Sequence, residues 1–426
     1  MKYKVINFGC KVNTYESTYI EEKFIANNLT EASSLEDANL IVINTCSVTN
    51  VADQKCKKMI RRIRRENPSA VIVATGCSVQ NNFEEYKTYG VNILVDNYHK
   101  GEIYDLFKKY LETSENIYIY DNNRKQKFES MLLEKFTKHT RAFIKIQDGC
   151  DNFCSYCVIP LVRGSIRSKD FNEVINEANT LAENGHKEIV LVGIHTGSYN
   201  SDGKDLVDLI NEISKIDKIK RIRISSIEIT ELNDKFMELL KNNEKVVNHL
   251  HIPLQAGSDE ILKIMNRKYD LKYFEEKIKL IRSIRPDINI TTDVIVGHPY
   301  ETEELFNHTL EFCEKIYFGK IHVFPYSIRK NTKASLMPNQ VSETDKKKRA
   351  EKLIRLSDIL MDKYENQFLE KEMDIITEIN HKGEIVGFTS NYIKTFINNP
   401  DGLKANELIK VKLLSRDNNY VYAEKI

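Results

Sequence analysis

The chain has 426 residues, a formal net charge of +1 and 29% charged residues, so the composition of the whole chain does not demand a nucleic-acid partner. Its length predicts two or three domains. No apolar run approaches the length of a membrane span, so we expect a soluble, cytoplasmic protein with no membrane partner. In a reducing compartment, the eight cysteines are better explained as metal ligands and buried thiols than as disulfides.

The first domain, which we place at residues 1–135, begins with short apolar runs that alternate with helical patterns. This alternation is typical of a doubly wound α/β domain. A helix is expected to begin near Asn13, because Glu16 follows three residues later. Residues 101–135 are expected to form a polar connection. Three runs predict buried parallel strands: 4–8, 40–44 and 71–75.

A cysteine follows each of these three strands, namely Cys10, Cys46 and Cys77. Ligands of doubly wound sheets bind outside the carboxyl ends of the strands, so we expect the three thiols to converge on one edge. Cys56 differs, because it falls on the apolar stripe of the next helix and is expected in the core.

The other face of that helix is strongly basic. A phosphate-binding surface and an ordinary solvated surface both explain such a face. Its members are Lys55, Lys57, Lys58, Arg61, Arg62, Arg64 and Arg65.

A second group of three cysteines, Cys150, Cys154 and Cys157, follows another strand-like run. A closed zinc site or an ordinary electron-carrying cluster normally takes four ligands, so three thiols leave one iron open for an exogenous ligand. The CxxxCxxC spacing resembles the signature of radical S-adenosylmethionine (SAM) enzymes, in which the open iron of a 4Fe-4S cluster chelates SAM. Three ligands of a zinc knuckle with a distant fourth ligand are the alternative.

Residues 136–366 predict a partial (βα)6 barrel, in which chemistry is expected at the carboxyl ends of the strands. Gln255 ends one strand and Asp293 lies inside an apolar one; a buried polar group needs a partner, either a ribose hydroxyl of SAM or neighbouring backbone. Cys313 falls on a helical apolar stripe and is expected to pack. The strand candidates are 142–147, 188–194, 220–226, 249–254, 289–296 and 319–325, and the helical segments include 170–184, 258–284 and 301–316.

The end of the chain changes character. Residues 342–370 read as a charged helical linker, and residues 367–426 predict a small antiparallel β-barrel. Small barrels of this kind commonly bind RNA through stacked aromatic side chains, here Phe388 and Tyr392, although a purely structural role explains the barrel equally well.

Together the motifs resemble those of the methylthiotransferases along nearly the whole chain. The resemblance implies that Cys10, Cys46 and Cys77 bind an auxiliary 4Fe-4S cluster, and that the final barrel is an RNA-binding TRAM domain. It also assigns the later three cysteines to the SAM cluster. The motifs are Gly-Cys-Lys-Val-Asn at 9–13, Asn-Thr-Cys at 44–46, Thr-Gly-Cys at 75–77, the central cysteine loop, Pro-Leu-Gln-Ala-Gly-Ser-Asp at 253–259, Met-Asn-Arg at 265–267, Asp-Val-Ile-Val-Gly at 293–297 and Tyr-Ser-Ile-Arg at 326–329.

Three branches of this family differ in substrate. The motifs at 9–17 and 46–53 are most similar to the branch that modifies N6-threonylcarbamoyladenosine (t6A) of tRNA. The branch that acts on isopentenyladenosine tends to carry glutamine and methionine where this chain has Lys11 and Val12, and the third branch acts on a ribosomal protein. His298, Tyr300 and Asn331 depart from the family pattern, which commonly has phenylalanine at the first position and glycine at the other two.

Carbon 2 of adenine bears an unactivated C–H bond that no side-chain acid or base breaks usefully at neutral pH, so we expect no catalytic side chain but a cofactor-supplied radical. The resemblance implies reductive cleavage of SAM at one cluster and a sulfur carried by the other, which gives 2-methylthio-t6A at position 37. The implied partners are the tRNA anticodon stem-loop and an electron donor such as a flavodoxin or ferredoxin; the sulfur source stays open. A non-catalytic iron-sulfur RNA-binding protein is the alternative from another class.

Overall fold

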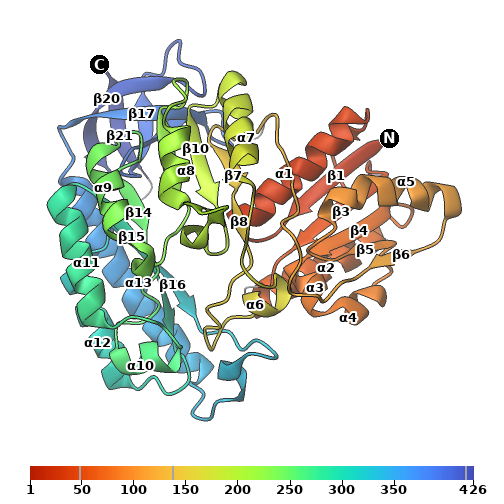
Figure 1. Cartoon of the computed structure of the whole chain (residues 1–426), viewed down its shortest axis with the longest axis horizontal. Coiled ribbons are helices and arrows are strands. Elements are labelled where there is room, and N and C mark those ends of the chain that lie inside the picture. The colour runs from red at the N-terminus through yellow and green to blue at the C-terminus, as the bar shows by residue number, and fades with distance from the viewer. Residues whose placement is uncertain (48, 137–138, 418–419) are drawn as a thin grey trace.

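The computed structural model describes residues 1–47, 49–136, 139–417 and 420–426, so Val48 of the second motif lies outside the described residues. Three parts follow one another along the chain: an α/β sheet, a set of parallel strands wrapped by helices, and a closed β-barrel (Figure 1). Among the described residues, no helix is both long and apolar enough to cross a membrane.

The N-terminal part is a six-stranded parallel sheet with helices on both faces, as expected of a doubly wound domain. Its strand order is β2-β1-β3-β4-β5-β6. Helices α1 and α5 pack on one face through Phe24 and Phe107, and α2 packs on the other through Ile60 and Ile63. The elements are β1 (Lys2–Asn7), α1 (Lys11–Ala26), β2 (Thr30–Glu31), β3 (Leu40–Thr45), α2 (Asn50–Glu66), β4 (Val71–Gly76), α3 (Cys77–Asn81), α4 (Phe83–Lys87), β5 (Ile93–Val95), a 3-10 turn (Lys100–Glu102), α5 (Ile103–Thr113) and β6 (Ile117–Ile119).

Two expectations for this part were wrong. The polar connection contains α5 and β6, because Ile103 and Phe107 lie one turn apart and bury one side of a helix against the sheet. Helix α1 begins at Lys11, and Asn13 donates to the carbonyl oxygens of Phe8 and Thr45 at 2.8 and 3.0 Å. Asn13 therefore joins two strand ends, and Glu16 pairs with cations beyond the sheet.

The central part contains six parallel strands in two groups of three, β13-β10-β7 and β14-β15-β16. A bridge between Ile222 and Val246 links the groups, which confirms the open, partial barrel. Its main elements are β7 (Ala142–Lys145), α7 (Phe171–Glu183), β10 (Glu188–Val192), α8 (Leu206–Ile213), β13 (Arg221–Ile224), α9 (Asp234–Asn242), β14 (His249–His251), α10 (Asp259–Ile264), α11 (Leu271–Ile284), β15 (Asn289–Val296), α12 (Glu303–Ile316), β16 (Lys320–Pro325) and α13 (Glu343–Asn366).

Short elements decorate this part: β8 (Gln147–Asp148), α6 (Ile159–Val162), β9 (Arg167–Ser168), β11 (Asn200–Ser201), β12 (Lys204–Asp205), and 3-10 turns at Thr196–Ser198, Ile229–Glu231 and Lys333–Leu336. The segment 258–284 is two helices, α10 and α11, because Asn266 between them has a φ of 62°. The expected linker is also part of this fold: α13 packs along β16 and buries Leu353 and Leu360.

The C-terminal part is a closed five-stranded barrel of β17 (Glu372–Ile379), β18 (Ile385–Thr389), β19 (Lys394–Asn398), β21 (Val421–Lys425) and β20 (Leu408–Arg416), in that order. It is not purely antiparallel, because β19 and β21 pair in parallel. It docks against the first residues of the central strands: Arg221 donates to the carbonyl oxygen of Phe388 at 2.7 Å, and Asn289 donates to that of Asn391 at 2.8 Å. The barrel therefore lies at the end of the central part opposite the cysteine loops.

A buried ionic network joins the N-terminal sheet to the central part. The Glu16 carboxylate on α1 accepts hydrogen bonds from Lys145 at 2.8 Å and Arg163 at 3.0 Å, and it also pairs with Lys100. Arg163 and Lys145 also pair with Asp148, at 3.1 and 2.7 Å. Burial alone would raise the pKa of Glu16, but Arg163, Lys100 and Lys145 hold it well below its usual 4.5.

Glu16→Gln should lower the free energy of unfolding of the metal-free protein by about 3–5 kcal/mol, because it leaves buried cations without their counter-charge. The lowered pKa means that the native protein keeps this contribution above pH 4.5 and loses it as the pH falls further, so the variant should show a shallower loss in acid. Urea unfolding over a pH series measures both effects. Glu84→Gln, at an exposed pair with Lys87, should leave stability unchanged; equal effects of the two changes would contradict the role of the network.

Candidate functional site

The first three cysteines lie at the carboxyl ends of β1, β3 and β4, which are neighbours in the sheet. Gly9 and Gly76 precede two of them with φ of 116° and 98°, a region that side chains rarely adopt. A Cβ atom at Gly9 would lie 2.9 Å from the Cβ of Cys46 and 3.0 Å from its sulfur, so the strand ends meet closely.

Cys10, Cys46 and Cys77 therefore gather as predicted, and we call them the sheet-edge triad. Cys46 and Cys77 are buried, whereas Cys10 has exposed surface. Even so, the surrounding protein raises the pKa of Cys10, and Arg163 and Cys77 also act on it.

Arg163 belongs to the central part and contacts the sheet-edge triad directly. Its side chain is fully buried, and its Nε donates to the Cys77 sulfur at 3.2 Å. Its Nη2 donates to Asn13 at 2.8 Å. Asn97 reaches the same sulfur at 3.7 Å and the carbonyl oxygen of Val162 at 2.7 Å. A thiolate at Cys77 would thus have a cationic donor beside it.

The second group, Cys150, Cys154 and Cys157, lies in a loop that follows β8, and we call it the loop triad. Other motifs of the sequence hold this loop in place. The Ser155 amide donates to the carbonyl oxygen of Met265 at 3.0 Å, and Asn266 donates to those of Asn152 and Phe153 at 3.2 and 3.1 Å. Arg267 lies 3.4 Å from the Cys154 sulfur and pairs with Glu228.

Two histidines that sequence reasoning missed also contact this loop. Buried His298 lies 3.1 Å from the Ser155 hydroxyl. His195 lies 2.5 Å from Glu231; burial lowers its pKa, but hydrogen bonds with Cys150 and Glu231 raise it to about 10. His298 stood out in the sequence only as a departure from the family pattern, and His195 stands in no motif named above, so only the tertiary structure reveals these contacts.

The thiols of the loop triad lie close enough to influence one another. Burial first, and then the nearby Cys154 and Cys150, raise the pKa of Cys157 to about 12. Such a thiol stays protonated at neutral pH unless a metal takes the place of its proton. The chemistry of this donor set therefore fits a metal centre.

The two triads are neighbours across the interface between the N-terminal and central parts. Cys77 packs against Val158 and Val162, which belong to the segment directly after Cys157. The next residue, Arg163, contacts the Cys77 sulfur. The segment 158–163 therefore connects the loop triad to the sheet-edge triad.

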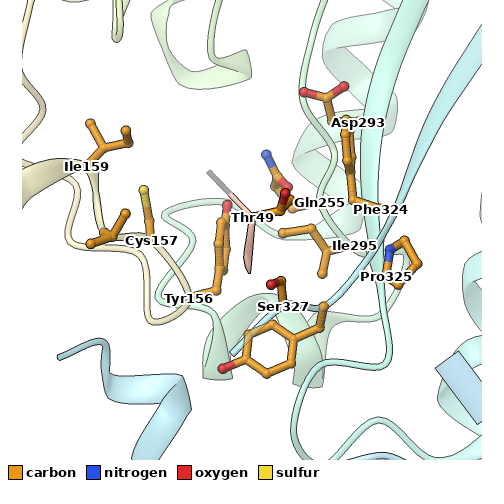
Figure 2. A pocket seen from close by; sticks show the side chains of 12 residues that line it. Thr49, Tyr156, Cys157, Ile159, Gln255, Asp293, Ile295, Phe324, Pro325 and Ser327 are labelled. Carbon is orange, nitrogen blue, oxygen red and sulfur yellow. The ribbon is translucent and has the colours of Figure 1, made fainter. Parts of the chain in front are cut away.

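A cavity of about 200 Å³ opens beside the loop triad (Figure 2). Gln255 and Asp293 both line it together with Cys157, so the structure brings the two predicted polar residues to one place. Figure 2 shows Cys157 and Ile159 on one side of this space and Thr49, Gln255 and Asp293 on the other. The lining residues are Thr49, Tyr156, Cys157, Val158, Ile159, Gln255, Asp293, Ile295, Phe324, Pro325, Tyr326 and Ser327.

The side chains of Gln255 and Asp293 differ in their partners. Backbone hydrogen bonds of 2.8 Å link Gln255 to Asp293 and to Ile295, but its side-chain amide has no hydrogen bond to the described residues. The Asp293 carboxylate meets His251 Nε2 at 3.2 Å. The partner of Asp293 is thus an imidazole, not the backbone group offered as an alternative, and Gln255 keeps free donors for a ligand.

Motifs far apart in sequence meet at the edge of the cavity. The Asn50 amide donates to the Ser327 hydroxyl at 3.0 Å, and its side chain donates to the carbonyl oxygen of Ile328 at 2.8 Å. The Arg329 guanidinium donates a hydrogen bond to the side-chain oxygen of Asn50 at 2.7 Å. The Tyr-Ser-Ile-Arg motif thus fixes the loop that carries Thr49 into the cavity.

The departures from the family pattern keep the backbone that glycine would give. Tyr300 and Asn331 have φ of 70° and 68°, in the left-handed region. For a residue other than glycine this conformation costs about 1–2 kcal/mol. Tyr300 and Asn331 therefore keep the left-handed backbone conformation that glycine commonly adopts at these positions.

No three His, Cys, Asp or Glu side chains in the described ranges are close enough to share one metal ion. In a 4Fe-4S cluster each thiolate binds a different iron, so cluster ligands lie farther apart than those of a single ion. The remaining cysteines, Cys56 and Cys313, are fully buried, as predicted, and the Cys56 sulfur lies 4.0 Å from the carbonyl oxygen of Cys46. The residues present fit two clusters with three protein ligands each.

Two residues on the basic face of α2 and two aromatic residues of the barrel are engaged within the protein. On the basic face of α2, Lys57 is buried against Asp53 and Glu85, at 3.1 and 2.8 Å, and Arg64 donates to the carbonyl oxygen of Ala70 at 2.7 Å. The other residues of that face, Lys55, Lys58, Arg61, Arg62 and Arg65, are exposed, so both explanations of the face stay open. Phe388 and Tyr392 are also engaged within the protein. Their rings stack at 4.8 Å, and Tyr392 stacks on His249 at 4.7 Å. These aromatic side chains therefore dock the barrel and are not free platforms for bases.

The model of the radical SAM superfamily matches residues 144–313, and that of the uncharacterized protein family UPF0004 matches residues 2–95. The chain is 40% identical, over 98% of its length and 94% of the relative, to the threonylcarbamoyladenosine tRNA methylthiotransferase MtaB of Bacillus subtilis. It is 36% identical to the MtaB of Thermotoga maritima, with 97% and 95% covered. A tRNA-2-methylthio-N(6)-dimethylallyladenosine synthase of Endomicrobium trichonymphae is 32% identical, with 93% of each chain covered.

Among solved structures, the fold is similar to that of the radical S-adenosylmethionine methyltransferase TsrM from Kitasatospora setae with cobalamin and a 4Fe-4S cluster bound. The TM-score is 0.58 at 13% identity, and the match covers 79% of this chain and 77% of that chain. At this identity the likeness concerns the fold alone.

After anaerobic reconstitution we expect about eight irons per chain, because each triad would hold one four-iron cluster. Alanine at Cys150, Cys154 and Cys157 together should leave about four irons, whereas Cys313→Ala, in the core of the central part, should leave all of them. Metal analysis with the visible absorption spectrum measures this. Zinc as the sole bound metal would contradict the cluster assignment.

Proposed function

Since the chain belongs to the radical SAM tRNA methylthiotransferases, we propose that it transfers a methylthio group to carbon 2 of t6A at position 37 of tRNA. One observation carries the site: a single cavity is lined by Cys157, Gln255 and Asp293, and the sheet-edge triad packs against the segment that follows Cys157. In this proposal residues 1–135 provide the sulfur-transferring end, residues 136–366 provide SAM cleavage, and residues 367–426 contact RNA.

The loop triad would hold the SAM-binding cluster and the sheet-edge triad the auxiliary cluster. When bound, these groups and SAM supply a 5′-deoxyadenosyl radical and a methylated sulfur, which is the chemistry that an unactivated C–H bond requires. The protein itself contributes by holding the reacting groups in position. Gln255 offers a free amide to SAM, and Asp293, oriented by His251, offers a carboxylate. Ile159, Ile295 and Phe324 make the cavity wall apolar and limit water.

Arg163 acts as a positioning residue between the two centres. It donates to the Cys77 sulfur and is itself fixed by Glu16 and Asp148. The buried guanidinium beside the Cys77 sulfur would offset the negative charge of a sulfur that binds iron. Because its partners come from both sides of the interface, Arg163 also fixes the distance between the triads.

The t6A branch is supported over the isopentenyladenosine branch by the relatives, which are 40% and 36% identical for t6A enzymes and 32% for the dimethylallyladenosine enzyme. A ribosomal-protein substrate is less consistent with relatives whose names refer to tRNA. The electron donor, a flavodoxin or ferredoxin, stays a prediction from the family resemblance, as does the anticodon stem-loop as the contacted part of tRNA.

The roles of the triads can be separated by substitution. Cys77→Ala removes a ligand of the auxiliary cluster but leaves the loop triad intact, so reductive cleavage of SAM to 5′-deoxyadenosine should survive while methylthiolated RNA is lost. Cys154→Ala should abolish both. Liquid chromatography of the nucleosides measures both products. Methylthiolated product from the Cys77→Ala protein would show that the sheet-edge triad is not the sulfur-transferring centre.

The substrate branch is tested with two tRNAs, one carrying t6A and one carrying isopentenyladenosine at position 37. The reduced enzyme should methylthiolate the first, as read by mass spectrometry after digestion. Product from the second tRNA alone would assign the other branch. Binding of tRNA without any consumption of SAM under reduction would favour the non-catalytic alternative.

A further inference from the structure

Lys11 directly follows the first cysteine of the sheet-edge triad, as the first residue of α1. Helix α1 lies against β7 of the central part (Figure 1). Lys11 has exposed surface, yet burial lowers the pKa of its ammonium group, and the charges of Tyr392, Arg141, Arg223 and Asp293 also act on it. Because these groups belong to the central part and the C-terminal barrel, and α1 packs on β7, the Lys11 ammonium group lies on the side of α1 that faces the central part. Among the described residues it has no ion pair or hydrogen bond.

The inner side of the barrel strands is polar. In β13, Ile222 and Ile224 join the apolar core, so Arg223 points to the other side. In β15 the same alternation places Thr291 and Asp293 on the inner side, because Ile290 and Val294 are in the core. The barrel interior is thus built to receive a polar group.

A row of hydrogen-bonded side chains runs along this inner side to the cavity. The Thr291 hydroxyl lies 2.9 Å from both His249 and His251, and His251 lies 3.2 Å from Asp293. The His322 ring is 5.6 Å from that of His251. Asp293 also lines the cavity, so the row connects the cavity with the surroundings of Lys11.

The deepest part of this interior holds an incompletely satisfied cation. Arg223 is 2% exposed, and its Nε donates to Glu188 at 2.7 Å. Its Nη1 and Nη2 are buried and have no hydrogen-bond partner in the described part of the chain. The guanidinium lies 4.5 Å from the Tyr392 ring. Buried donors of this kind are costly, and a bound anion would satisfy them.

We propose that Lys11, with Arg223 behind it, binds the carboxylate of the threonylcarbamoyl group and so selects t6A over apolar N6 substituents. The proposal rests on the proposed function and deepens it. The substituent of t6A ends in a carboxylate, whereas an isopentenyl group has no charge. Lys11 directly follows Cys10, so an anion held at Lys11 keeps the modified nucleotide close to the sheet-edge triad.

The charge balance of the interior favours one added anion. Arg141 is paired with Glu378 at 2.9 Å, and Arg223 with Glu188, but Lys11 has no such partner in the part of the chain that the structure describes. Asp293, the acid whose charge also acts on Lys11, meets His251, which carries a charge only when protonated. Glu188 is shared by Arg223 and Arg221, at 2.7 and 3.8 Å, so the cations Lys11, Arg141, Arg221 and Arg223 outnumber the carboxylates Glu188, Glu378 and Asp293 by one. A substrate carboxylate would complete an ion pair in a place where solvent screens it weakly.

The test uses two synthetic anticodon stem-loop RNAs, one with t6A and one with the methyl ester of t6A, which has the same shape but no charge. The full-length, reconstituted wild-type enzyme should prefer the acid. Lys11→Gln should lower kcat/KM for the acid by about ten- to a hundredfold and change that for the ester little. Lys11→Arg should keep the preference. Lys109→Gln, at an exposed position on α5, is the matched control and should behave as wild type.

The comparison of acid and ester separates binding of the charge from a loss of structure, because a misfolded variant would lose both activities together. If Lys11→Gln keeps the wild-type preference for the acid, the proposed role of Lys11 is wrong while the proposed function stands. If the wild-type enzyme modifies neither t6A RNA nor its ester but modifies isopentenyladenosine RNA, the proposed function and this inference both fail.

Discussion

The buried ionic network around Arg163 is the interaction on which the arrangement of the site depends. Arg163 reaches Glu16 from the N-terminal sheet, Asp148 from the central part and the sulfur of Cys77 with one guanidinium group. Charges inside a protein are costly unless each finds partners in the right geometry. The network is satisfied only when the two parts are docked in one way, so it fixes the position of one triad relative to the other.

The same interface explains why the sequence motifs are short and far apart. Residues of one motif form hydrogen bonds with residues of another motif. Asn266 and His298 fix the backbone and side chains of the central cysteine loop, and Arg329 fixes Asn50 beside the cavity. Motif residues without thiols therefore act as supports, which a radical reaction needs because a reactive group must meet only its intended target.

The C-terminal barrel closes the base of the central part, a role that its sequence did not predict. Tyr392 fills the base of the central part, where it stacks on His249 and lies under Arg223. This contact leaves the outer surface of the barrel for other partners, and that surface carries the exposed lysines Lys382, Lys394 and Lys410. The barrel thus joins the end of the chain to the interior that faces Lys11.

The sequence alone determined the two cysteine triads, the three-part architecture and the strands that carry each thiol, because these features follow from local spacing and from apolar periodicity. The sequence also indicated Gln255 and Asp293, since polar residues in buried strands are unusual.

The sequence did not predict contacts whose two partners lie far apart along the chain. The helix of residues 343–366 seemed a linker because its charges hide the stripe that packs on β16. Arg163, His298 and Tyr392 gained their roles only from contacts across the interfaces, and no local pattern encodes such contacts. The tertiary structure decided them, since the burial of a charge or a ring depends on what the rest of the chain places against it.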